Sequence, residues 1–143
     1  MTSTLLRLRL ALCCSLLVSL ATFGAPGVAA ERYTGLIVDA RGLTVERSMA
    51  PTVSSVTGTK LFPICDEEHP LDVDFMLSEG LAIYTSSIEE AWRIKRIGGM
   101  PLVVKAVALE DGELVLDEAS SRALLSADHE SGFLEKYAVA IVN

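Results

Sequence analysis

The chain has 143 residues, 12 of them basic and 19 acidic, and a formal net charge of −7. This acidic balance argues against nucleic acid and anionic membrane surfaces as partners, because both require a basic face. The length suits one domain of ordinary size. The three cysteines cannot supply the disulfide framework on which many small exported domains depend.

The first thirty residues have the three parts of a signal peptide in the expected order. Two arginines precede an uncharged apolar run at 10–24, and the small residues APGVAA at 25–30 follow it. The apolar run is shorter than the ~20 residues that cross a bilayer. We therefore predict that residues 1–30 are a signal peptide cleaved near Ala30. The remainder, 31–143, is expected to be a single periplasmic or secreted domain without a permanent membrane anchor.

The first half of this domain carries several short strand patterns. Residues 34–40 (TGLIVDA) are apolar and β-branched and end at a turn, and residues 51–57 predict a second strand at a sheet edge because they begin with proline. Residues 58–74 combine two prolines with an acidic run, which favours a loop. Residues 81–85 (LAIYT) predict a third strand.

A helix is expected next. Ser86 and Glu89 have the spacing of a capping box, and the apolar stripe after them extends to Ile97, where Gly98 and Gly99 end it. Residues 101–109 then predict a central strand that is apolar except at Lys105.

The last third predicts a hairpin, a helix and a strand. Glu110-Asp111-Gly112 is a turn sequence that joins the central strand to residues 113–116. Asp117 can cap a helix over 118–127, and residues 133–142 predict a final strand. This order indicates an α+β fold: one layer sandwich with a mostly antiparallel sheet of four to five strands and two helices on one face.

An acidic loop is one candidate for chemistry. Asp66, Glu67, Glu68 and His69 offer oxygen and nitrogen ligands, but their spacing matches neither a calcium loop nor a zinc signature. A solvated loop is the simpler interpretation. The nearby Cys65 could serve as a nucleophile beside His69, could form an intermolecular disulfide, or could be an idle thiol. We expect no metal and no cofactor.

The end of the first strand is the candidate binding site, made of Asp39, Arg41 and Gly42. Residues two apart in a strand project on the same face, so the carboxylate and the guanidinium can pair with each other or grip a partner's charged group. Structural pairing that fixes the strand end is the simpler of the two readings, because terminal ion pairs are common and weak.

Several stretches together resemble a known family. The opening TGLIVDARGL at 34–43, the step MAP at 49–51, GLAIY at 80–84, PLVVKA at 101–106 and the closing strand resemble, in order, a largely uncharacterised family of bacterial exported domains. That family opens with TGL(I/V)(I/V)DARGL and is related to flagellar outer-membrane lipoproteins of the FlgP type. The resemblance implies an envelope assembly component. It supplies no catalytic residue.

The sequence thus predicts a non-enzymatic exported envelope protein, associated with the flagellum by the resemblance. Its expected partner is a protein of the cell envelope or a second copy of itself. The alternative is a small periplasmic hydrolase or metal-dependent enzyme that uses the loop from Asp66 to His69. A third possibility is a small-ligand carrier with an apolar cleft beside Trp92.

Overall fold

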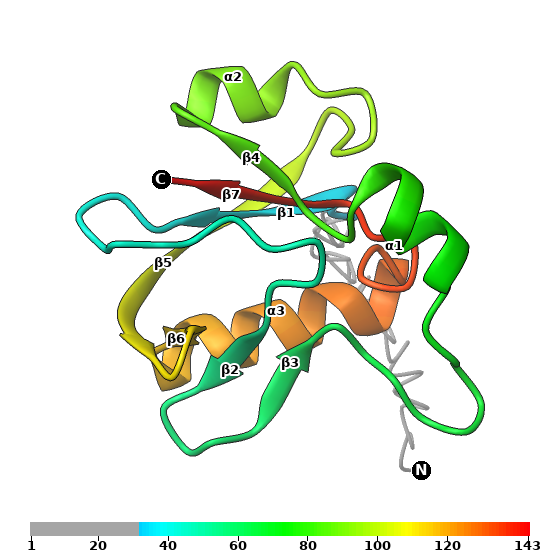
Figure 1. Cartoon of the computed structure of the whole chain (residues 1–143), viewed down its shortest axis with the longest axis horizontal. Coiled ribbons are helices and arrows are strands. Elements are labelled where there is room, and N and C mark those ends of the chain that lie inside the picture. The colour runs from blue at the N-terminus through cyan, green and yellow to red at the C-terminus, as the bar shows by residue number, and fades with distance from the viewer. Residues whose placement is uncertain (1–31) are drawn as a thin grey trace, which may run out of the picture.

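The computed structural model describes residues 32–143, so the predicted signal peptide lies outside the described residues. Figure 1 shows the chain order of the elements. No helix in this described range is both long and apolar enough to cross a membrane. The elements are β1 (Gly35–Asp39), β2 (Val53–Ser55), β3 (Lys60–Phe62), α1 (Val73–Glu79), β4 (Ile83–Thr85), α2 (Ile88–Trp92), β5 (Pro101–Glu110), β6 (Glu113–Leu116), α3 (Glu118–Ser131) and β7 (Val139–Val142).

The strands form one seven-stranded mixed sheet in the order β3-β2-β6-β5-β1-β7-β4. Four neighbouring pairs are parallel: β1 with β5, β1 with β7, β4 with β7, and β2 with β6. The hairpins β2–β3 and β5–β6 are antiparallel. The interior strand β1 therefore has two neighbours that come from the second half of the chain.

The predicted fold class is wrong in strand number, strand direction and helix number. The expected sheet was mostly antiparallel with four to five strands and two helices, whereas the described residues form seven strands and three helices. Parallel neighbours cannot be joined by a tight hairpin, and in each of the four parallel pairs other elements separate the two strands along the chain. Between β4 and β7, for example, lie α2, β5, β6 and α3. The uninterrupted burial of β1 and β7 is typical of strands covered on both faces.

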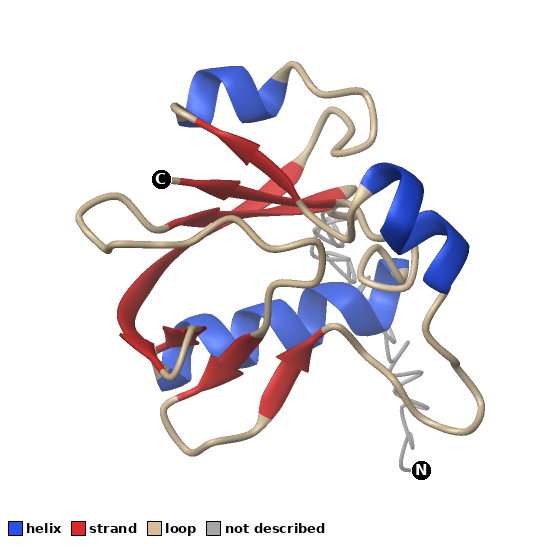
Figure 2. Cartoon of the chain, viewed as in Figure 1, coloured by secondary structure: helices blue, strands red, loops and turns tan. Residues whose placement is uncertain are grey.

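Helices α2 and α3 lie on opposite faces of the sheet (Figure 2). The expectation of helices on one face is therefore wrong as well. Ile37 of β1 belongs to the small cluster that α2 covers with Ala91. Its neighbour in the strand, Leu36, belongs to the main core with Leu124 of α3. Alternate residues of one strand thus pack under different helices.

A close backbone approach explains the glycine that begins β1. A Cβ at Gly35 would lie 2.5 Å from the carbonyl oxygen of Ile97 and 2.9 Å from that of Ala138. Both neighbours are backbone atoms and cannot swing aside. Gly35 therefore lets the chain after α2 and the chain before β7 close tightly on the sheet.

Several predicted boundaries are confirmed and others move. The β5–β6 hairpin is confirmed, with both turn residues at positive φ, Asp111 at 50° and Gly112 at 84°. The N-cap of α2 is Ser87 instead of Ser86: Ser87 Oγ accepts from the Glu90 backbone N–H, and the Glu90 carboxylate accepts from the Ser86 backbone N–H. The capping box exists but is shifted by one residue.

The predicted loop at 58–74 is wrong in part, because it contains β3 and the start of α1. The strand predicted over 133–142 is shorter, since β7 begins only at Val139 and α3 extends to Ser131. The helix predicted to reach Ile97 ends at Trp92. Ile94 and Ile97 lie beyond the end of the helix but still pack on the cluster beneath α2. The apolar pattern therefore indicated contact with the core, and it did not indicate a helix.

Candidate interaction surface

The end of β1 carries a bidentate ion pair between Asp39 and Arg41. Arg41 Nε donates to Asp39 Oδ1 and Nη2 donates to Oδ2, each at 2.8 Å, and the Arg41 backbone N–H donates to Oδ1 at 3.2 Å. The Arg41 hydrogen bond holds the pKa of Asp39 below its ordinary value. Gly42 follows at a φ of 92°, a conformation that favours glycine and turns the chain away.

The predicted binding residues therefore lie together, and the two charged ones neutralise each other. The Arg41 side chain is 53% exposed and the Asp39 side chain 15%. Glu89 of α2 also lies near enough to act on the charge of Arg41. The simpler of the two interpretations, a pair that fixes the strand end, describes this geometry, and it leaves one edge of the guanidinium open to solvent.

One face of β5 adjoins this pair and is open to solvent. Val103 is 40% exposed and Val107 is 51% exposed, and Lys105 between them is exposed as well. In the parallel register, Asp39 lies opposite Lys105 and Ile37 lies opposite Val103. We call Val103, Lys105 and Val107 the β5 face. It continues the side of the sheet that α2 covers over β1.

An open face is unusual for this strand. β5 is paired on both sides, with β1 and with β6, and its opposite face holds Val104 and Ala106 in the core. Interior strands of α/β sheets are normally covered on both faces. The β5 face is therefore an apolar surface at the centre of the sheet that the described chain leaves bare.

The loop that follows β1 is held firmly and packs on the main core, on the opposite side of the sheet from the β5 face. Tyr84 Oη accepts a hydrogen bond from the Ser48 backbone N–H at 2.9 Å, and the Arg47 guanidinium lies 5.7 Å from the centre of the Tyr84 ring. Asn143 Nδ2 donates to the Val45 carbonyl at 3.3 Å. The segment 40–50 is thus fixed at several points to the carboxyl ends of β4 and β7, where ligands bind in open α/β sheets.

The acidic loop is organised around His69 and lies elsewhere. Asp66 Oδ1 accepts from the Glu68 and His69 backbone N–H groups and lies 3.1 Å from His69 Nδ1. His69 Nε2 lies 3.4 Å from Glu135 Oε1 on the opposite side of the ring. The hydrogen bond from the His69 ring to Asp66 and the charge of Glu135 raise the pKa of His69. Because the two carboxylates lie at opposite ends of the imidazole, they do not surround a common point.

No three His, Cys, Asp or Glu side chains of residues 32–143 are grouped so that they could hold a metal ion. Glu67 and Glu68 are exposed, and Cys65 is an exposed free thiol. A hollow of about 270 Å³ does adjoin His69. It is lined by Ile64, His69, Pro70, Asp72, Glu135 and Tyr137.

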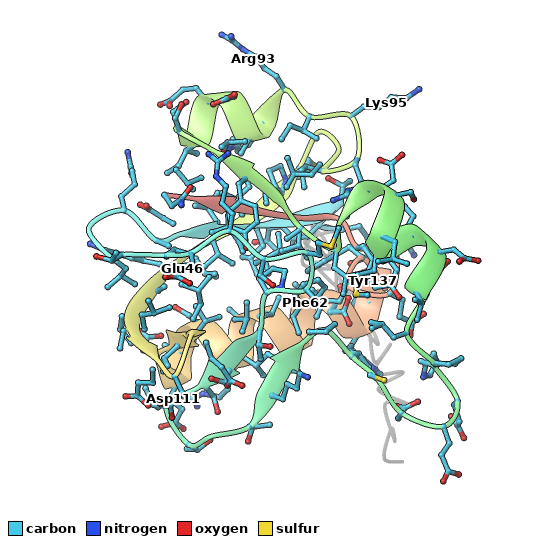
Figure 3. All side chains as sticks on the ribbon, viewed as in Figure 1. Glu46, Phe62, Arg93, Lys95, Asp111 and Tyr137 are labelled. Carbon is cyan, nitrogen blue, oxygen red and sulfur yellow. The ribbon has the colours of Figure 1, made fainter. Side chains whose placement is uncertain are left out.

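Tyr137 ties the acidic loop and α1 to the sheet. Its ring stacks on Phe75 of α1 at 5.2 Å, and its hydroxyl accepts from the backbone N–H of Asp72, the N-cap of α1. The Arg96 guanidinium lies 5.2 Å from the centre of the Phe75 ring. Figure 3 shows Tyr137 beside α1. Since α1 buries no residue completely, these contacts hold it in place.

Trp92 is not enclosed in a cleft: it lies at the end of α2 with 47% of its surface exposed. A mainly apolar hollow of about 200 Å³ lies between the β2–β3 hairpin and α3 instead, lined in part by Val56, Leu61 and Leu125. The β5 face was missed by the sequence analysis. Lys105, the one charge within an otherwise apolar strand, was the signal that could have indicated it.

The chain is similar to one family of known proteins. The model of the family described as Treponema pallidum Tp0624, second domain, matches residues 35–143, a range that holds all seven strands and three helices of the described chain. No curated protein matches. The expectation of a bacterial domain family is met to this extent, while the relation to FlgP-type lipoproteins stays a prediction.

Proposed function

The chain belongs to the Tp0624 second-domain family, and we propose on this premise that it is a non-enzymatic protein of the cell envelope that works by binding another protein. The family description places the domain beside at least one other domain in the Treponema pallidum protein. A unit that works beside other domains needs a surface on which they pack. That context supports an assembly role for the present chain.

The observation that carries the proposal is the β5 face. Val103 and Val107 are both at least 40% exposed on a strand that is paired on both sides. Leaving the exposed half of each valine in water at the centre of the sheet gives up hydrophobic free energy of about 1 kcal/mol for each side chain. A partner that covers them recovers it. Asp39, the register neighbour of Lys105, and its partner Arg41 lie at the border of this surface, which supports the prediction that Asp39, Arg41 and Gly42 take part in binding.

A second part of the proposal concerns where in the cell the protein works. The leader-like segment at 1–30 supports export to the periplasm or beyond it. The similarity of the opening TGLIVDARGL to relatives of FlgP-type lipoproteins supports a place near the flagellum. We therefore propose that the partner is an envelope protein, and that the flagellar apparatus is the first assembly in which to look for it.

A comparison of two matched valine substitutions tests the binding role. Val107 on the β5 face and Val73 at the start of α1 are each 51% exposed. We expect mature wild type and Val73→Glu to retain one envelope protein from a native extract and Val107→Glu to lose it, with all three equally folded by circular dichroism. Retention of the same protein by all three, or of none by the wild type, contradicts the proposal.

The rival function is a small hydrolase that uses the acidic loop. The hollow beside His69 favours it, since Asp66 and His69 resemble a base with its orienting carboxylate. Against it, both ring nitrogens of His69 face carboxylates, so neither is free to accept a substrate proton. Hydrolysis of an ester or amide library by the wild type, lost in His69→Gln, would favour the rival. We expect no such activity.

A further inference from the structure

The partner of the β5 face cannot bind by adding a strand. β5 is hydrogen-bonded to β1 and to β6, so its backbone groups are already paired. A partner must therefore pack side chains against the face. In α/β sheets the element that covers a sheet face is a helix.

The spacing of the strands leaves room for a helix over β5, beside α2. α2 contacts β4, β7 and β1, which places it over β7, the middle strand of the three. β5 lies two strands away from β7, which is about 10 Å at the usual strand spacing. Packed helices have axes 8–10 Å apart. A helix over β5 would thus lie beside α2 at an ordinary packing distance.

The length of the face also suits a helix. Val103 and Val107 are four strand residues apart, about 13 Å in a regular strand and somewhat less here because β5 has a bulge between Ala106 and Ala108. Two turns of an α-helix rise about 11 Å. Apolar residues at positions i and i+7 of a helix would therefore meet the two valines, with a third residue near Lys105 between them.

Lys105 determines which charge we expect on that third residue of the partner helix. No carboxylate of residues 32–143 lies within ion-pair distance of its ammonium group, because the ion pairs of the described chain join other residues. Asp39, its register neighbour, is held by Arg41. The cation that stands between the two valines is thus left for a partner's carboxylate. A second copy packed face to face would place Lys105 against Lys105, which argues against self-association through this surface.

We infer that the β5 face receives an amphipathic α-helix of another envelope protein, with apolar residues on Val103 and Val107 and a carboxylate on Lys105. The inference rests on the proposed function and specifies its partner. It predicts that this helix lies over β5 and beside α2, parallel or antiparallel to β5.

Photo-crosslinking in the native cells tests it with the full chain. The crosslinking amino acid p-benzoylphenylalanine replaces Val107 in one strain and the equally exposed Val73 in another. We expect one protein adduct from position 107 and none from position 73. The captured peptide, identified by mass spectrometry, should have apolar residues at i and i+7 and an acidic residue between them.

A synthetic copy of the captured peptide then completes the test. Trp92 is the single tryptophan of the chain and is exposed at the end of α2, the helix next to which the partner helix would pack, so its fluorescence is used to follow binding. We expect the peptide to become helical on binding, Lys105→Glu to weaken binding at least tenfold, and a peptide with its acidic residue changed to lysine to restore binding to Lys105→Glu.

The outcomes separate the inference from the function on which it rests. A captured peptide that stays extended, an adduct with a second copy of the chain, or unchanged affinity in Lys105→Glu overturns the helix and leaves a binding role standing. An envelope protein captured from position 73 alone likewise overturns the helix and leaves a binding role standing. Capture of nothing from either position overturns both.

Discussion

Asp39 and Arg41 are joined by two hydrogen bonds of 2.8 Å between a carboxylate and a guanidinium that lie two residues apart at the end of β1. The pair is fixed and faces Lys105 across the parallel register. Asp39 forms its hydrogen bonds with Arg41 and acts on Lys105 only through its charge. In the proposed function, the β5 face therefore offers a lysine without a hydrogen-bonded carboxylate between two valines.

The Asp39–Arg41 pair gives the fold a small acid-sensitive stability. The pKa of Asp39 is lowered from 3.8 by the hydrogen bond from Arg41, so the stabilisation is present above 3.8 and is lost as the pH falls through the lower native value. We expect Asp39→Asn to unfold at a lower urea concentration than the wild type at about pH 6 and at the same concentration near pH 2. A difference of equal size at both values would mean that the pair contributes nothing through charge.

His69 gives a stability change of the opposite sign. Asp66 and Glu135 raise its pKa above 6.5, and Glu68 acts in the same direction. The stabilisation is therefore complete below 6.5 and is lost as the pH rises through the higher native value. The ring resonances of His69 should titrate above 6.5 in the wild type and at a lower pH in Glu135→Gln. Identical titration in both proteins would show that Glu135 does not act on the ring.

Gly35 is the glycine at which an added methyl group should lower the free energy of unfolding most. Alanine there must displace the carbonyl oxygens of Ile97 and Ala138. We expect Gly35→Ala to lower the free energy of unfolding by about 1–3 kcal/mol. Gly99, whose added Cβ would meet nothing within 4 Å, is the control: Gly99→Ala should be neutral or stabilise by up to about 1 kcal/mol. Equal stabilities in urea titrations would show that the contact relaxes freely.

Phe75 holds α1 to the rest of the protein through Tyr137 and Arg96. Because α1 buries no residue completely, Phe75→Ala should release it locally without unfolding the sheet. We expect faster proteolysis between residues 63 and 80 and a free energy of unfolding lowered by no more than about 2 kcal/mol. Leu77→Ala on the same helix, where the side chain is exposed, should change neither. Cleavage spread over the whole chain would contradict a local role.

The sequence predicted the elements that carry strong local signals. The β5–β6 hairpin followed from the turn sequence Glu110-Asp111-Gly112 between two apolar runs, and β1 followed from its apolar, β-branched run. Sheet direction was wrong because the pairing partners of β1 are β5 and β7, which lie more than sixty residues along the chain. The uninterrupted burial of β1 on both faces was the available sign of a parallel sheet.

The weaker elements left little pattern to detect. β3 has three residues and α1 has no fully buried side chain, so neither has an apolar stripe that distinguishes it from a loop. Their places are set by pairing with β2 and by the Tyr137 stack. The Tyr137 stack joins residues distant in the sequence, which no local periodicity reports, and the β2–β3 hairpin is too short for a clear alternation.

The candidate site was predicted in part. Asp39 and Arg41 were expected to share a face, and they do. The exposure of Val103 and Val107 was missed, because an apolar strand has much the same sequence whether or not a helix covers it, and Lys105 between them was the one sign of an open face. α2 has only five residues and contacts β4, β7 and β1.

Lysine labelling tests the central claim most directly. The chain has four lysines, Lys60, Lys95, Lys105 and Lys136, and all four are exposed; Lys95 projects away from the body of the molecule (Figure 3). An amine-acylating reagent should modify all four in the purified protein. In intact native envelopes we predict that Lys105 is protected at least several-fold while Lys95 reacts as before. Equal modification of Lys105 in both preparations would contradict a protein partner on the β5 face.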